Sequence, residues 1–126
     1  MDNEKCDKDP KYLGIPNICF SLTNVDDDRE KKYKKQRLKR GFDDSETWSL
    51  SDTIANFIIP RFKRFTKISY DFIDFSKKDK KRHKQFLRAM ELIVRDDGAR
   101  NYTEEERKEI KKGLKAFPKI FDGLWW

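Results

Sequence analysis

Large apolar residues recur at three- and four-residue intervals between Trp48 and Phe65, and this pattern constrains the fold more than any other feature of the sequence. Residues with this spacing lie on one face of an α-helix, where they can pack against a core. The stripe consists of Trp48, Leu50, Ile54, Phe57, Ile58, Phe62 and Phe65. Pro60 lacks a backbone N–H, so we expect a kink or a break in this core helix near residues 56–59.

Two segments nearer the C-terminus also have helical spacing. Ser76 is a suitable N-cap for a helix that extends to Arg95, and residues 96–98 (DDG) are expected to end it. Residues 103–106 (TEEE) form a capping box, which begins a last helix that Pro118 kinks or shortens. We expect these two helices to contribute to the core Phe86, Leu87, Met90, Ile93, Ile110, Leu114, Phe117 and Phe121.

The remaining segments are less regular. Residues 26–41 begin with three aspartates, continue as a basic stretch and end at Gly41, which predicts a polar helix with a glycine stop. Residues 66–75 fit an irregular segment better than a strand, because an isolated strand lacks a partner. Prolines and a glycine punctuate residues 1–25, so we expect a non-helical arm there.

Composition indicates how these segments combine. Hydrophobic residues make up only 36% of the chain and charged residues 42%, a balance that favours disorder. Aromatic residues reach 13%, however, and large rings bury roughly 150–250 Å² each, so a few can build a core. We therefore predict a mainly α fold: a single-domain bundle of three to four helices over residues 26–126, with an extended N-terminal arm over residues 1–25.

The net charge of +7 is concentrated in two basic blocks, residues 29–40 and 77–88. The two blocks together carry roughly +13, which leaves about −6 for the rest of the chain. Such a distribution favours phosphate-rich molecules or an acidic protein surface as partners. The alternative is that both blocks are solvated helix faces that only keep the protein dissolved.

Aromatic rings beside these bases could stack on nucleobases, and the arginines near Pro60 add fork-shaped donors. The two C-terminal tryptophans either clamp the tail onto the core or form an exposed hot spot for a partner. The residues that we expect to contact a partner are Lys34, Lys35, Arg37, Lys39, Arg40, Arg61, Arg64, Lys80, Lys81, Arg82, Trp125 and Trp126.

The sequence contains no recognisable catalytic set, and it predicts no enzyme, no cofactor and no metal site. Cys6 and Cys19 with a distant His83 do not make a metal-ligand set, and we expect His83 to be a surface residue of its helix. Acidic pairs such as Asp43-Asp44 and Asp96-Asp97 lie at expected helix ends, where capping explains them. No apolar stretch approaches the roughly 20 residues that span a bilayer, so no membrane partner is expected. The charged N-terminus lacks the apolar run of a signal peptide, which predicts a reducing cytoplasm.

The stretch from Arg40 to Phe65 resembles an uncharacterised family of small proteins encoded by tailed bacteriophages, with the central motif W-x-L-x-x-T-I-A-x-F-I-x-P-R. Residues 89–93 (AMELI) and the Leu124-Trp125 pair near the end also resemble this family, whereas the first 25 residues do not. The positions that carry the central motif are Arg40, Gly41, Phe42, Trp48, Leu50, Thr53, Ile54, Ala55, Phe57, Ile58, Pro60, Arg61, Lys63 and Phe65. The resemblance implies a phage origin and a helical core with a proline in its central helix, and it implies no activity.

These features together predict a non-enzymatic phage interaction protein. It would bind and inhibit or sequester a host defence factor through its basic surface, in the host cytoplasm. One alternative is a virion or assembly protein that packs as a homo-oligomer. Another is a protein that binds nucleic acid or a cyclic nucleotide, for which a phosphate-rich ligand would be the partner.

Overall fold

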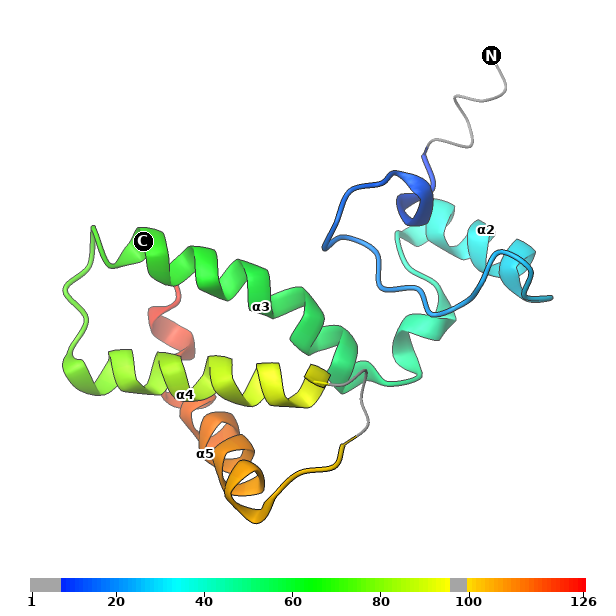
Figure 1. Cartoon of the computed structure of the whole chain (residues 1–126). Coiled ribbons are helices and arrows are strands. Elements are labelled where there is room, and N and C mark those ends of the chain that lie inside the picture. The colour runs from blue at the N-terminus through cyan, green and yellow to red at the C-terminus, as the bar shows by residue number, and fades with distance from the viewer. Residues whose placement is uncertain (1–7, 96–99) are drawn as a thin grey trace. The chain divides into compact units, whose positions relative to one another are not determined.

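The computed structural model describes residues 8–95 and 100–126, and these residues are mainly helical and contain no β-strand, as predicted. Figure 1 shows the α-helices α2 (Glu30–Arg40), α3 (Leu50–Ser69), α4 (Lys77–Val94) and α5 (Glu104–Ile120). Short 3-10 helices lie at η1 (Pro10–Tyr12), η2 (Asp44–Thr47) and η4 (Phe121–Gly123). The chain forms two compact units, Met1–Thr53 (unit 1) and Ile54–Trp126 (unit 2). The expected boundary between residues 25 and 26 stays a prediction.

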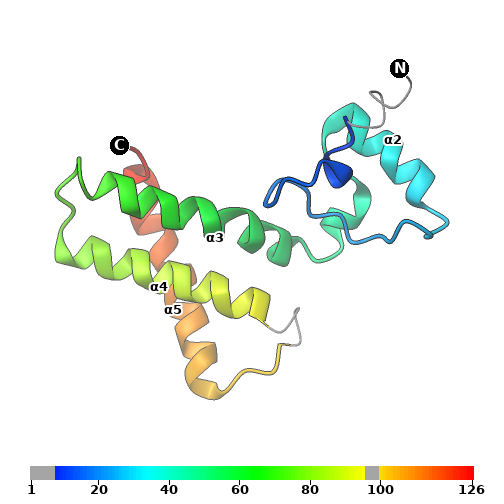
Figure 2. The same ribbon diagram turned by 45° about the horizontal axis from the view of Figure 1, so that its top comes forward.

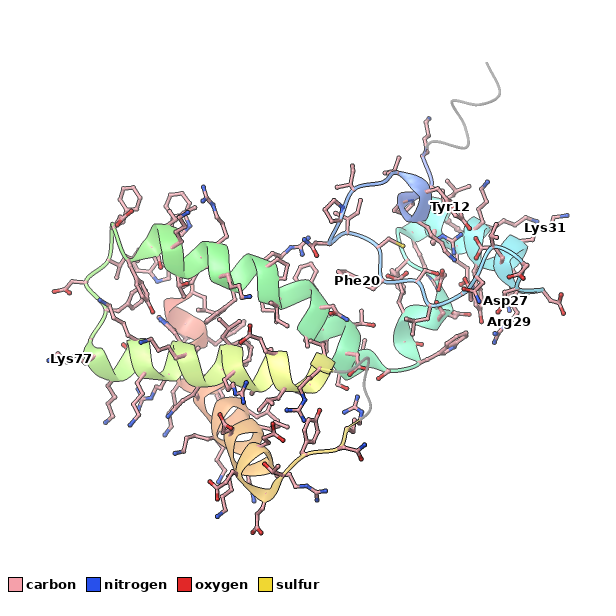
Figure 3. The ribbon with its side chains drawn as sticks, viewed as in Figure 1. Tyr12, Phe20, Asp27, Arg29, Lys31 and Lys77 are labelled. Atoms are coloured by element: carbon pink, nitrogen blue, oxygen red, sulfur yellow. The ribbon has the colours of Figure 1, made fainter. Side chains whose placement is uncertain are left out.

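Unit 1 is built around α2, which ends at Gly41 with a φ of +90°, so the predicted glycine stop is confirmed. The described part of the expected arm forms η1 and an irregular chain that packs on α2 and η2 (Figure 3). The Tyr12 hydroxyl donates to Glu30 Oε2 at 2.7 Å, and the Phe20 N–H donates to Glu46 Oε1 at 3.0 Å. These hydrogen bonds make the segment part of the same compact unit as α2.

Helix α3 continues past Pro60, so a break near residues 56–59 does not occur, and the alternative expectation of a kink stays a prediction. A proline removes only the hydrogen bond to the carbonyl four residues earlier, here that of Asn56. Asn56 is exposed, and its carbonyl can bond to water instead. The helix extends to Ser69, so the expectation of an irregular segment is wrong for residues 66–69, whereas residues 70–75 are irregular as predicted.

Only the second half of the predicted apolar stripe faces the core. Ala55 and Phe62 are buried, and Ile58 and Ile59 pack partly against the same cluster. The helix carries apolar residues on more than one face, and tertiary packing covers only one of them. As a result, several expected core residues are exposed: Trp48, Leu50, Ile54 and Phe57 in this region, and Leu114 and Phe121 near the C-terminus.

In unit 2, α5 packs across α4 at a steep angle, and α3 lies alongside α4 in both views (Figures 1 and 2). Ser76 caps α4 and Thr103 caps α5 in a complete capping box, as predicted. Helix α5 continues past Pro118 to Ile120, so the proline does not shorten it to its own position. The expected stop at residues 96–98 lies outside the described residues.

Gly113 sets the close approach of α4 and α5. A Cβ atom at this position would lie 2.3 Å from the Gln85 carbonyl oxygen and 2.4 Å from Ala89 Cβ. Only glycine therefore allows the two backbones to come this near. The buried residues of the resulting core are Ala55, Phe62, Phe86, Ala89, Met90, Ile93 and Ile120.

Candidate functional site

A basic groove runs between α4 and α5 in unit 2, with a volume of about 370 Å³. Helix α4 contributes Arg82 and Gln85, and α5 contributes Ala116 and a row of lysines. The groove is lined by Arg82, Gln85, Lys108, Lys111, Lys112, Lys115, Ala116 and Lys119. No acidic side chain is among these lining residues. The groove therefore combines an aliphatic floor, made of Ala116 and the stems of the basic side chains, with a rim of positive charge.

The helical repeat of α5 explains this row. Positions 108, 111, 112, 115 and 119 recur at the three- and four-residue spacing that keeps side chains on one face. A rise of about 1.5 Å per residue spreads them over roughly 16 Å along the helix axis. The opposite side of α5 carries Gly113 and Phe117 against α4, and Phe117 stacks on Phe86 with a centroid distance of 4.6 Å. Packing of the apolar side thus fixes where the lysines point.

Most of the positive charge in the groove is not compensated. Arg82 forms an ion pair with Asp79 at 3.3 Å, and Lys108 lies 3.8 Å from Glu105. The other four lining lysines form no ion pair within the described ranges 8–95 and 100–126: Lys111, Lys112, Lys115 and Lys119. Like charges held on one helix face repel one another, and an anion bound between them relieves this repulsion.

Arg37 was expected to contact a partner. It lies instead in the centre of unit 1, where a partner cannot reach it. Its side chain is fully buried and forms ion pairs with Asp9 at 2.8 Å, with Glu30 and with Asp43. Burial by itself raises the pKa of Glu30, but hydrogen bonds from Arg37 and its neighbours outweigh this and lower that pKa to about 2. The charge of Arg37 is therefore used inside the fold and is not presented to a partner.

The other expected residues of α2 lie on the surface. Lys34 is half-buried, whereas Lys35 and Lys39 are exposed. Arg40 is also exposed, and it forms an ion pair with Asp44 at 2.7 Å and lies over the Phe42 ring. Figure 3 shows the neighbouring Lys31 directed away from the body of unit 1. The block thus splits into one buried arginine and a row of outward lysines.

The expected residues of unit 2 do not form one site. Arg61 lies over the Phe57 ring at 3.9 Å and donates to the Phe57 carbonyl, and Arg64 is exposed on the same helix. Lys80 lies over the Tyr70 ring at 4.8 Å, and Lys81 is exposed. Among the expected residues, Arg82 alone lines the groove. Trp125 and Trp126 are 65% and 60% exposed, so the interpretation that they clamp into the core is wrong.

Sequence reasoning missed the lysine row of α5. The signal was present, because these lysines have the same spacing as an apolar stripe, but mostly apolar residues separate them and they do not form a continuous block. His83 was also misplaced: it is 2% exposed, and its Nδ1 lies 2.8 Å from the Tyr70 hydroxyl. Burial among aromatic rings lowers the pKa of His83, and the Asp79 carboxylate opposes this only in part.

The remaining observations concern metal ligands, membrane spans and thiols. Within the described residues no group of histidine, cysteine and acidic side chains could hold a metal ion, and no helix is long and apolar enough to cross a membrane. Cys19 is a half-buried free thiol, and Cys6 and the Asp96-Asp97 pair lie outside the described residues. No family model matches the chain, and no curated protein or solved structure is significantly similar to it.

Proposed function

We propose that this chain is a non-enzymatic binding protein that holds closely spaced anionic groups in the groove between α4 and α5. The single observation that supports the proposal is the convergence of one arginine and five lysines on a groove without an acidic lining residue. Four of these lysines form no ion pair in the described parts of the chain. Such a surface attracts anions at long range and holds them by displacing their counterions.

The groove suits recognition of charge more than recognition of a base. Its lining contains no aromatic ring on which a nucleobase could stack, and its one fork-shaped donor, Arg82, is engaged by Asp79. Lysine ammonium groups act as point charges that tolerate different arrangements of phosphates or carboxylates. The ligand is therefore a row of phosphates or carboxylates on a larger molecule. In the phage setting that the resemblance implies, that molecule would be a host factor that the protein sequesters.

The test is a charge reversal in the groove. The groove variant, Lys112→Glu with Lys115→Glu and Lys119→Glu, changes three exposed side chains that form no ion pair in the described ranges. We expect at least a tenfold loss of affinity for a fluorescent single-stranded oligonucleotide, with a salt dependence weaker by about two to three ions. Poly-glutamate serves as the second probe, because binding of only one of the two distinguishes phosphate from carboxylate ligands.

A matched control reverses the same number of charges on α2. The α2 variant, Lys32→Glu with Lys35→Glu and Lys39→Glu, has the same spacing, the same net charge and one substitution in the last helical turn. It should bind both probes far better than the groove variant does. Equal losses in the two variants would mean that net charge alone drives binding, and would refute the assignment to the groove.

A further inference from the structure

Unit 2 exposes a group of large aromatic rings at the end of the chain. Phe72, in the segment between α3 and α4, stacks on Trp126 with a centroid distance of 5.5 Å and an interplanar angle of 17°. Both rings remain largely exposed, Phe72 at 70% and Trp126 at 60%, and Trp125 is 65% exposed. Exposed stacked rings of this size are typical of the centre of a binding interface.

The same two segments carry exposed carboxylates around these rings. Asp71 and Asp74 flank Phe72, and Asp122 lies in η4, just before the tryptophans. The segments are adjacent in space, because a Cβ atom at Gly123 would lie 3.8 Å from the Phe75 ring. None of these three acids forms an ion pair with the residues that the structure describes. The acidic–aromatic patch consists of Asp71, Phe72, Asp74, Asp122, Trp125 and Trp126.

We propose that the acidic–aromatic patch of one copy of this protein docks into the basic groove of a second copy. The patch offers carboxylates around a set of rings, and the groove offers lysine ammonium groups around an aliphatic floor. Rings would cover the floor and the aliphatic lysine stems, while the acids would meet the lysines of the rim. The two surfaces therefore complement each other in both polarity and charge.

The charge distribution also favours a second copy of the chain as the partner. In a protein with a net charge of +7, a surface with three uncompensated acids is the natural counterpart of a groove with four uncompensated lysines. Two copies can pair reciprocally around a two-fold axis, or each can bind the next in a ring. This inference uses the same groove as the proposed function, so anionic ligands and a second copy compete for it.

The experiment is a charge swap measured by light scattering and sedimentation equilibrium across micromolar concentrations. The patch variant carries Asp71→Lys, Asp74→Lys and Asp122→Lys, all on exposed side chains. Circular dichroism serves to check that this variant keeps the wild-type fold. The wild type should self-associate, and the patch variant and the groove variant should each be monomeric. An equimolar mixture of these two variants should assemble one to one, because each acidic surface again meets a basic one.

The α2 variant is the control, since it has the net charge of the groove variant and an intact groove. By itself it should self-associate as the wild type does, because its acidic–aromatic patch and its groove are both unchanged. A wild type that stays monomeric throughout, or a mixed pair that does not associate, overturns the inference. Oligonucleotide binding by a monomeric wild type would still leave the proposed function standing, so the two can fail separately.

Discussion

Different interactions stabilise the interior of each of the two units. In the described part of unit 1, Tyr33 is the one buried apolar side chain, and the centre is occupied by Arg37 with Asp9, Glu30 and Asp43. Unit 2 instead buries a cluster of aromatic and aliphatic side chains around Phe62 and Phe86. A buried ionic centre loses stability when one charged partner is removed, whereas an apolar core loses stability when a smaller side chain leaves a cavity.

The ionic centre of unit 1 is also tied to the chain segment that precedes α2. The Lys11 ammonium and the Thr23 hydroxyl both donate to Glu30, at 3.1 Å and 2.7 Å, and Ser21 donates to Asp43 at 2.6 Å. These bonds satisfy lone pairs that Arg37 alone could not reach. This polar network thus stabilises residues 8–53, as hydrophobic contacts stabilise unit 2.

Removal of the buried cation is expected to have the largest effect. Arg37→Met leaves Asp9, Glu30 and Asp43 buried without their counterion, which should destabilise unit 1 by about 3–5 kcal/mol. Hydrogen exchange followed by mass spectrometry should show loss of protection over residues 8–53 and little change in α4 and α5. Unchanged protection of unit 1 would contradict the view that this network holds it together.

Removal of core volume should have a slightly smaller effect, in the other unit. Phe62 is 2% exposed and packs edge-to-face on Phe86 at 5.2 Å, so Phe62→Ala leaves a cavity and should destabilise unit 2 by about 3 kcal/mol. The same exchange experiment should now show loss of protection in α4 and α5, with η1 and α2 unaffected. Equal losses in both units would mean that the two unfold as one.

The stabilities of the two units should also depend differently on pH, and this effect should be smaller than those of the two substitutions above. Burial holds the pKa of His83 below its usual 6.5, so the neutral ring stabilises unit 2 above pH 6.5, and this stability falls as the pH drops towards the folded pKa. The pKa of Glu30 is lowered to about 2, so unit 1 loses stability only between pH 4.5 and 2. Exchange measured from pH 7 to 5 should therefore weaken unit 2 first, and His83→Phe should remove that dependence.

The smallest effect is expected from a second arginine on the same helix. Arg40 forms a single ion pair with Asp44, and both side chains are more than 40% exposed. Arg40→Met should change the stability of unit 1 by less than about 1 kcal/mol, because solvent screens an exposed pair. Thermal unfolding of Arg37→Met and Arg40→Met under the same conditions measures the contrast directly. Similar shifts for the two variants would mean that burial of Arg37 contributes nothing.

Local sequence signals specify the helices and most of their ends. Ser76, Thr103 and Gly41 act on backbone groups within a few residues of themselves, so their roles follow from local sequence alone. The mainly α fold and the capping box of the last helix were predicted for this reason. Pro60 does not break α3, because the carbonyl of the exposed Asn56 can bond to water instead.

Which residues each helix buries depends instead on contacts with distant parts of the chain. Arg37 and His83 look like surface residues in their basic blocks, yet distant carboxylates enclose the first and aromatic rings from α3 and the following segment enclose the second. The lysine row of α5 became a groove only because Gly113 lets α4 approach it. Capping depends on neighbours in the chain, whereas burial and charge compensation depend on residues far apart in sequence, which local patterns do not specify.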